Sequence, residues 1–327
     1  MSPPPSRSTP LALKAGLWLL LALALLAAAT LWRARAHEAR AEARWPPSGR
    51  IVAVEGHPVH VREMGAGPPL VLIHGASGNL RDFTFSLAER LAARYRVIAL
   101  DRPGLGYTPR LGDGGASITV QAGLLMRAAG KLGAERPILL GHSYGGAVAL
   151  AWAVHHPDRL AGLVPLAAAS NPWESDLSLY YRLTSHPWLG PVAAALISAW
   201  VPDRVVEEAV AEVFAPQPVP ERYAAHFGPG LTLRRATLRE NALQRAAINA
   251  EIRDLHTRYG AIEVPVEILH GDADTTVGLS IHSEPLAEQI EGARLTVLEG
   301  VGHMPHHADE DAVVAAVDRA AARAGLR

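Results

Sequence analysis

Apolar runs and helical repeats alternate along most of the chain. The runs are short, lack polar alternation, and several end in glycine or aspartate. Between most of them, apolar residues recur at helical spacing, as in Leu87, Leu91 and Ala92. Strands of this kind, separated by amphipathic helices, predict a parallel sheet with helices on both faces. The predicted strands are 51–55, 59–64, 69–75, 96–101, 138–142, 160–168, 266–271 and 294–300, and the predicted helices are 80–95, 116–133, 145–155, 283–290 and 308–322.

The alternation stops between about residues 171 and 249. This stretch has no apolar strand pattern and contains prolines, short helical pieces and bulky aromatic residues such as Trp173 and Trp188. Two further strand patterns follow it. The sequence therefore predicts an α/β domain over residues 50–327, with a helical insertion before its last two strands.

The N-terminal part has a different character. Residues 15–32 carry no charge, and Lys14 and Arg33 flank them. About eighteen apolar residues, rising 1.5 Å each, suffice to cross the hydrocarbon core of a bilayer. We predict an uncleaved membrane anchor here, preceded by a tail of residues 1–14. The alternative is a secretory signal peptide with a small-residue cleavage site at 27–29, which would give a secreted or periplasmic protein.

Residues 33–49 form a predicted linker, either a short helix or a loose stalk, which ends at the prolines 46–47. Five arginines follow the apolar segment, whereas only Arg7 and Lys14 precede it. The positive-inside rule would then place the folded domain in the cytoplasm. A signal-anchor would place it on the opposite side, so the sequence leaves the side open.

The composition of the chain excludes several classes of partner and of chemical site. The chain has 327 residues, enough for one large domain with a full core. Its formal net charge is −1, so no basic surplus predicts a nucleic-acid partner. The absence of cysteine excludes disulfides, thiolate nucleophiles and cysteine-ligated metal sites.

A serine among glycines carries the strongest chemical signal. Residues 141–145 read GHSYG, which matches G-x-S-x-G, and they lie where a predicted strand meets a helix. A nucleophile elbow needs this setting, because small neighbours let the strand and helix approach while Ser143 is presented on a sharp turn. The alternative is a glycine-rich turn that only packs.

A serine nucleophile needs a base, and the base needs an orienting acid. Downstream, the segment 269–278 (LHGDADTTVG) follows one predicted strand and 299–307 (EGVGHMPHH) follows the next. Both lie at strand ends, the edge where α/β sheets build their sites. A carboxylate and an imidazole therefore occur after Ser143 in the order that the mechanism requires.

Five segments together resemble the α/β-hydrolase fold of serine hydrolases, over about residues 50–322. LIHGASGN resembles the oxyanion-hole loop, DRPGLGYT the D-x-P-G-x-G turn, GHSYGG the elbow, HGDADTTV the acid loop and GVGHMPH the histidine loop. The insertion resembles the lid of this family. The aromatic residues of the insertion suggest an apolar pocket. These motifs are specific for fold and mechanism and say little about substrate.

The resemblance implies a role for each catalytic position. Ser143 is the expected nucleophile. The acid of the family lies three residues after the glycine of its loop, which selects Asp274 rather than Asp272, and Asp272 is expected to cap the turn. The G-H-x-P pattern selects His303 as the base. Backbone N–H groups of Ala76 and Tyr144 are the expected oxyanion hole.

The remaining polar residues are given structural roles. His74 is expected to brace its loop and Asp101 to anchor its turn. His306 and His307 are expected to be solvated at the start of the last helix, and a zinc site that includes them is the weaker alternative. The pair 234–235 (RR) could meet an anionic substrate group, although solvated arginines are the simpler interpretation.

The resulting hypothesis is a carboxylic ester hydrolase that forms an acyl-enzyme, needs no cofactor or metal, and acts on a small apolar ester. The alternatives are a carbon–carbon bond hydrolase of ring-cleavage products, a peptidase for short substrates, and a non-catalytic binding protein tethered to a membrane.

Overall fold

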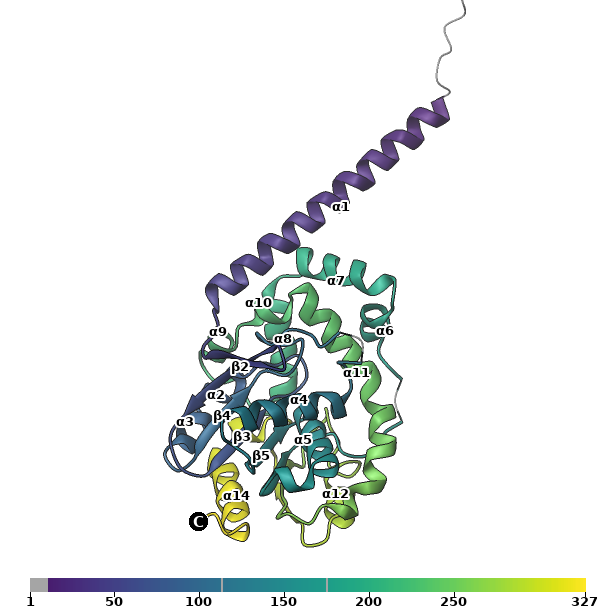
Figure 1. Ribbon diagram of the computed structural model, residues 1–327. Helices are drawn as coiled ribbons and strands as arrows, with labels where there is room; N and C mark the ends of the chain where they lie inside the picture. Colours follow the sequence, from purple (N-terminus) through teal and green to yellow (C-terminus); the bar gives the residue numbers. More distant parts are fainter. Residues whose placement is uncertain (1–10, 113, 175) are drawn as a thin grey trace, which may run out of the picture.

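The computed structural model describes residues 11–112, 114–174 and 176–327 (Figure 1). Within them, eight strands form one sheet in the order β1-β2-β4-β3-β5-β6-β7-β8. β2 is antiparallel to both of its neighbours, and all other pairs are parallel. This confirms the α/β-hydrolase fold class predicted from the sequence. The strands are β1 (Arg50–Val54), β2 (His57–Met64), β3 (Pro69–Ile73), β4 (Arg96–Leu100), β5 (Ile138–His142), β6 (Gly162–Leu166), β7 (Glu267–Gly271) and β8 (Arg294–Leu298).

Helices cover both faces of the sheet because its central strands are apolar on both sides. In β3, Val71 and Ile73 belong to one core, and Leu70 and Leu72 belong to the other. α4, α5 and α12 contribute to the first core, and α3 and α14 to the second. Continuous apolar strands therefore mark a doubly covered sheet, as the sequence predicted.

The helices of the core follow the predicted segments with one exception. The segment 80–95 is broken into two short helices, because Ser86 leaves the helical region with φ −155°. Asp309 begins the last helix by accepting a hydrogen bond from the backbone N–H of Ala312, 2.9 Å away. These helices are α2 (Arg81–Thr84), α3 (Leu87–Ala92), α4 (Ile118–Lys131), α5 (Tyr144–His155), α12 (Ser283–Gln289), α13 (Pro305–Ala308) and α14 (Glu310–Arg323).

Six further helices lie between β6 and β7, and we call them the insertion. In Figure 1 they lie at the end of the molecule from which the N-terminal helix departs. They are α6 (Leu179–Ser185), α7 (Leu189–Trp200), α8 (Asp203–Phe214), α9 (Tyr223–Phe227), α10 (Pro229–Thr232) and α11 (Arg235–Leu255). α11 is the longest and packs against α6, α7, α4 and α5, so it joins the insertion to the core.

The N-terminal helix α1 runs without a break over Leu11–Arg44. By length and composition, it can cross a membrane, although a signal sequence would have the same features. Its apolar half projects from the domain, whereas its second half packs on α7 and α10 (Figure 1). Of the two forms expected for residues 33–49, the structure therefore shows the helical one, and it lies on the insertion.

Candidate active site

Ser143 lies on a sharp turn between β5 and α5. Its backbone has φ 54° and ψ −119°, a conformation that costs a non-glycine residue of order 1–3 kcal/mol. The neighbouring glycines allow the close packing around it. A Cβ on Gly145 would lie 2.1 Å from the carbonyl oxygen of Ile73, and one on Gly146 would lie 2.3 Å from the Cβ of Ala168. The strain and the close packing are those of a nucleophile elbow.

The structure brings Asp274 and His303 together from the loops after β7 and β8. The Nδ1–H of His303 donates to Oδ2 of Asp274 at 2.7 Å, and both side chains are buried. Oδ1 of Asp274 accepts the backbone N–H groups of Thr276 and Val277 at 2.8 and 2.9 Å. Nδ1 of His303 is therefore the protonated nitrogen, which leaves Nε2 as the acceptor.

His270 is a further neighbour of this pair. Its Nε2–H donates to the carbonyl oxygen of Val277 at 2.7 Å and lies 3.1 Å from Oδ2 of Asp274. Burial opposes the charge on Asp274, but the hydrogen bonds from His270, His303 and the backbone outweigh it and hold the pKa of Asp274 well below its ordinary value. His270 is the histidine of the LHGD segment, and it was not among the residues expected at the site.

Asp272 lies outside this arrangement. Its side chain accepts the backbone N–H of Gly300 at 2.7 Å, and the residue is exposed. It joins the loop after β7 to the turn after β8. That contact is the capping role expected for it.

Ser143 and His303 line the same cavity as Ala76 and Tyr144. Tyr144 is the first residue of α5, so its backbone N–H has no acceptor within the helix. The loop that carries Ala76 is fixed at the next residue, because the backbone N–H of Ser77 donates to Asn241 of α11 at 2.7 Å. The insertion thus helps to place the candidate oxyanion loop.

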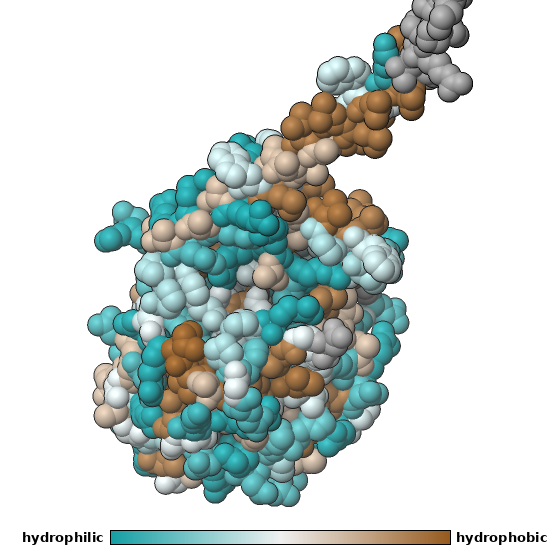
Figure 2. All heavy atoms as spheres, turned by 45° about the horizontal axis from the view of Figure 1, so that its top comes forward, coloured by the Kyte–Doolittle hydropathy of each residue, from teal (hydrophilic) through white to brown (hydrophobic). Residues whose placement is uncertain are grey.

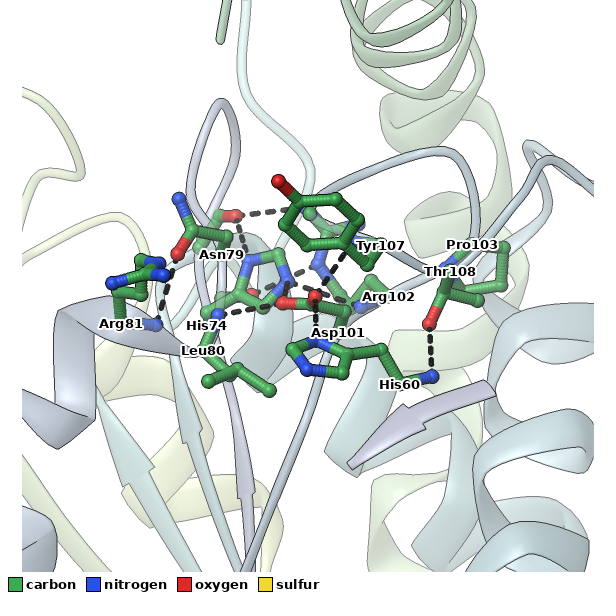
Figure 3. A network of polar contacts seen from close by, with 12 residues as sticks. His60, His74, Asn79, Leu80, Arg81, Asp101, Arg102, Pro103, Tyr107 and Thr108 are labelled. Carbon is green, nitrogen blue, oxygen red and sulfur yellow. Dashed lines mark hydrogen bonds and ion pairs between the residues drawn. The ribbon is translucent and has the colours of Figure 1, made fainter. Parts of the chain in front are cut away.

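A buried polar network holds the same loop from below (Figure 3). Arg102 is fully buried and donates to the carbonyl oxygens of His74 and Gly75, both at 2.8 Å. Its guanidinium also lies 4.3 Å from the ring centre of Tyr144. Arg102 therefore connects the two predicted oxyanion segments, a role that the D-R-P-G motif contains but that the sequence analysis did not assign.

His74 and Asp101 have the bracing roles expected of them. Nε2 of His74 accepts the backbone N–H of Arg102 at 3.0 Å, and its Nδ1–H donates to Gly75. Burial and the nearby Arg102 lower the pKa of His74 to about 4, so the ring is neutral. Asp101 accepts the backbone N–H groups of Leu80 and Tyr107, both at 2.7 Å, which anchors its turn.

The prediction for His306 and His307 is wrong, because both side chains are buried. Each Nε2 contacts the carboxylate of Asp82, at 3.0 and 2.9 Å, and Tyr223 donates to the same carboxylate at 2.7 Å. Burial works against the charge on Asp82, but the two histidines reverse this and hold its pKa well below the usual range. The three side chains are close enough for a metal ion, yet these hydrogen bonds already satisfy the carboxylate.

The prediction for Arg234 and Arg235 needs correction as well. Arg235 donates to both carboxylate oxygens of Glu38, each at 2.8 Å, and Arg234 donates to Glu42 at 3.1 Å. Both acidic residues belong to α1. The arginines are therefore neither free in solvent nor directed at the candidate site, and they attach the N-terminal helix to α11.

The cavity above Ser143 has a volume of about 850 Å³. Its wall is mostly aliphatic and aromatic, and about half of it comes from the insertion. Among the described residues that line the cavity, Arg245 alone is a lysine or an arginine. Its guanidinium carbon lies 5.0 Å from the ring centre of Trp173, on which it stacks. Such a cavity fits a largely apolar molecule with one polar group at the serine.

Comparison with known proteins agrees with this fold. The family model described as alpha/beta hydrolase fold matches residues 68–310. The chain belongs to the α/β-hydrolase family.

Relatives of this α/β hydrolase differ in their reactions. It is 30% identical to a 2-hydroxymuconate semialdehyde hydrolase from Pseudomonas putida over 269 residues, which cover 79% of this chain and 88% of the relative. A membrane phospholipase A described as a bacterial virulence factor superposes with a TM-score of 0.65 at 22% identity. The match covers 97% of this α/β hydrolase and 99% of the phospholipase. An esterase from a Rhodococcus species superposes with a TM-score of 0.64 at 24% identity, and the match covers 85% of this chain and 98% of the esterase. Both structural likenesses concern the fold.

Proposed function

We propose that this α/β hydrolase is a serine hydrolase that cleaves carboxylic esters of apolar acids or alcohols. The observation that carries the proposal is the buried Asp274–His303 pair, of which His303 lines the same cavity as Ser143 on its strained turn. A serine nucleophile, followed in the chain by an acid and then by the base that the acid orients, constitutes the machinery of acyl transfer.

The first half of the reaction forms an acyl-enzyme. Oγ of Ser143 attacks the ester carbonyl while Nε2 of His303 takes the serine proton. Asp274 stabilises the resulting imidazolium through the Nδ1–H bond. The carbonyl oxygen becomes an oxyanion, which the backbone N–H groups of Ala76 and Tyr144 receive. The tetrahedral intermediate then collapses: the bond between the carbonyl carbon and the alcohol oxygen breaks, and His303 gives its proton to that oxygen as the alcohol leaves.

The second half returns the enzyme to its starting state. His303 takes a proton from a water molecule, whose oxygen attacks the acyl-enzyme carbonyl. The same N–H groups stabilise the second oxyanion. Collapse of this intermediate releases the acid, and His303 returns the proton to Oγ of Ser143.

One observation supports a second candidate, carbon–carbon bond hydrolysis of a ring-cleavage product. Relatives named for 2-hydroxymuconate semialdehyde and 2-hydroxy-6-oxo-2,4-heptadienoate act on such compounds, and the second name denotes a carboxylate. Arg245 could pair with a carboxylate in the cavity, because its stack on Trp173 leaves the N–H donors in the plane of the guanidinium available. The apolar remainder of the wall supports the ester.

A substrate panel tests the proposal. The full-length protein in detergent is assayed with p-nitrophenyl esters of graded chain length and, in parallel, with 2-hydroxy-6-oxo-2,4-heptadienoate. We expect ester turnover that rises beyond the acetyl ester and is absent in Ser143→Ala. Turnover of the ring-cleavage product alone would support the second candidate. Turnover of neither, with no covalent labelling by a fluorophosphonate, would support a binding protein.

A further inference from the structure

The second half of α1 is attached firmly to the insertion. At its start, Nε of Arg33 donates to the carbonyl oxygen of Ala199 at 3.2 Å, and the guanidinium lies 4.3 Å from the ring centre of Trp200. The indole N–H of Trp200 in turn donates to Thr30 at 3.1 Å. These contacts fix α1 on the carboxyl end of α7.

The attachment continues to the end of the helix. His37 contacts Asp203 of α8 at 2.9 Å, and Glu38 accepts three hydrogen bonds from Arg235 of α11, two from its guanidinium and one from its backbone N–H. Trp45, one residue after α1, is buried against α10. Because the contacts involve four helices of the insertion, the direction in which the apolar half of α1 leaves the domain is fixed.

The surface of the insertion beside α1 is apolar. Figure 2 shows hydrophobic residues along α1 and on the adjoining face of the domain. On α6, on α7 and in the turn between them, large side chains are exposed to an extent that a water-facing surface seldom shows. They include Leu183 (41%), Trp188 (84%), Leu189 (51%), Val192 (58%), Leu196 (45%) and Trp200 (48%), and we call these six residues the apolar face.

Aromatic and basic residues occur where the spanning segment ends. Trp32 at that point is exposed, as are Trp188 and Trp200 of the apolar face. Arg33 and Arg35 follow directly in the sequence. Tryptophan and arginine favour the boundary between lipid headgroups and acyl chains, because one end of each side chain is apolar and the other is polar. In a bilayer that α1 spans, these residues would mark the boundary at the level of α7.

The cavity of the candidate site reaches the same helices. Its wall includes Tyr180 of α6, Ile197 of α7 and Val205 of α8. Tyr180 and Val205 are 41% and 42% exposed to solvent. The outer part of the cavity wall thus adjoins the apolar face.

We infer that the apolar face rests in the boundary region of the bilayer that α1 spans, and that apolar esters enter the cavity from the lipid phase. The orientation follows from the attachment of α1, and burial of the apolar face in lipid follows from the hydrophobic effect. The entry route rests on the proposed function, whereas the orientation does not.

The absence of cysteine gives a clean labelling test of the orientation. Val192→Cys places one fluorophore on the apolar face, and Val297→Cys places one on the edge strand β8, where Val297 is 45% exposed. Each full-length variant is reconstituted in phosphatidylcholine vesicles with and without lipids brominated on their acyl chains. We expect strong quenching at position 192 and little at position 297. Equal quenching at the two positions would overturn the inference, as would disulfide cross-linking of unlabelled Val192→Cys, which would assign the face to a second copy.

A second test concerns entry from the lipid phase. Leu189→Glu/Val192→Glu changes two residues outside the cavity wall, and Val297→Glu is the matched control. We expect the double variant to lose at least about tenfold in hydrolysis of an ester lipid within vesicles, since two aliphatic side chains no longer enter lipid. Its turnover of a short soluble ester should stay unchanged. Equal loss on both substrates, or on neither, would overturn the entry route. Failure of the unaltered protein on every ester would contradict the proposed function instead and leave the quenching result standing.

Discussion

Replacing Asp274 by asparagine changes one oxygen into an NH₂ group, and the structure determines where that group must lie. Oδ1 of Asp274 accepts two backbone N–H groups, from Thr276 and Val277, so the asparagine oxygen has to stay there. The new NH₂ therefore takes the place of Oδ2 and faces Nδ1 of His303. An NH₂ group donates, so His303 must accept at Nδ1 and carry its proton on Nε2. In that tautomer, it cannot take the proton of Ser143.

The size of the effect follows from the tautomer. The corresponding asparagine change in a serine protease triad lowers kcat by about 10⁴, which corresponds to roughly 5.5 kcal/mol of activation free energy. We expect a loss of this order in Asp274→Asn. Asp272→Asn is the matched control, because Asp272 is exposed and its amide replacement can still accept the N–H of Gly300. Its activity should stay within about threefold, as for other exposed substitutions.

The assay is kcat/KM for a p-nitrophenyl ester across a pH series, with the melting temperature of each variant measured alongside. The pH series matters because the loss in Asp274→Asn should persist at every pH at which the protein is folded. Near wild-type turnover by Asp274→Asn would refute the reasoning. A crippled Asp272→Asn with an active Asp274→Asn would assign the acid to the other aspartate.

Three further predictions concern the base, the loop and the anchor. His303→Ala and Ser143→Ala should each lose nearly all ester turnover, and the double variant should be hardly worse, because the members of a triad act as a unit; additive losses would contradict this. The unfolded chain binds a proton at His74 below about pH 6.5, whereas the folded chain does so only near pH 4. As the pH drops through this window, His74 should therefore lower the free energy of unfolding by up to roughly 3 kcal/mol. Urea denaturation at several pH values checks this, and His74→Asn should show a shallower dependence. The full-length protein should stay in the membrane pellet after alkaline extraction and keep residues 15–32 in its intact mass, whereas a mature N-terminus near Thr30 would show a cleaved signal peptide.

The sheet could be predicted because a buried strand appears in the local sequence as a run of apolar residues. Each central strand is an apolar run, and β5 ends one residue before Ser143, as the elbow motif requires. The choice of Asp274 over Asp272 came from the resemblance to a family, since spacing alone allows either. In the structure, Asp274 lies beside His303 and Asp272 lies at the surface.

Other features depended on contacts between distant segments. His306 and His307 look solvated in sequence, because nothing near them shows that Asp82 will lie against both rings. In the same way, Arg235 reads as a surface residue until the fold places it beside Glu38 of α1. Buried polar partners so far apart in the chain leave no local pattern.

Covalent labelling tests the central claim, that Ser143 is the nucleophile, most directly. The full-length protein is treated with a fluorophosphonate probe, and the adduct is located by mass spectrometry of its peptides. We expect one adduct on Ser143, none in Ser143→Ala, and a melting temperature of that variant close to wild type. An adduct on another residue, or ester turnover by folded Ser143→Ala at the wild-type rate, would contradict the claim.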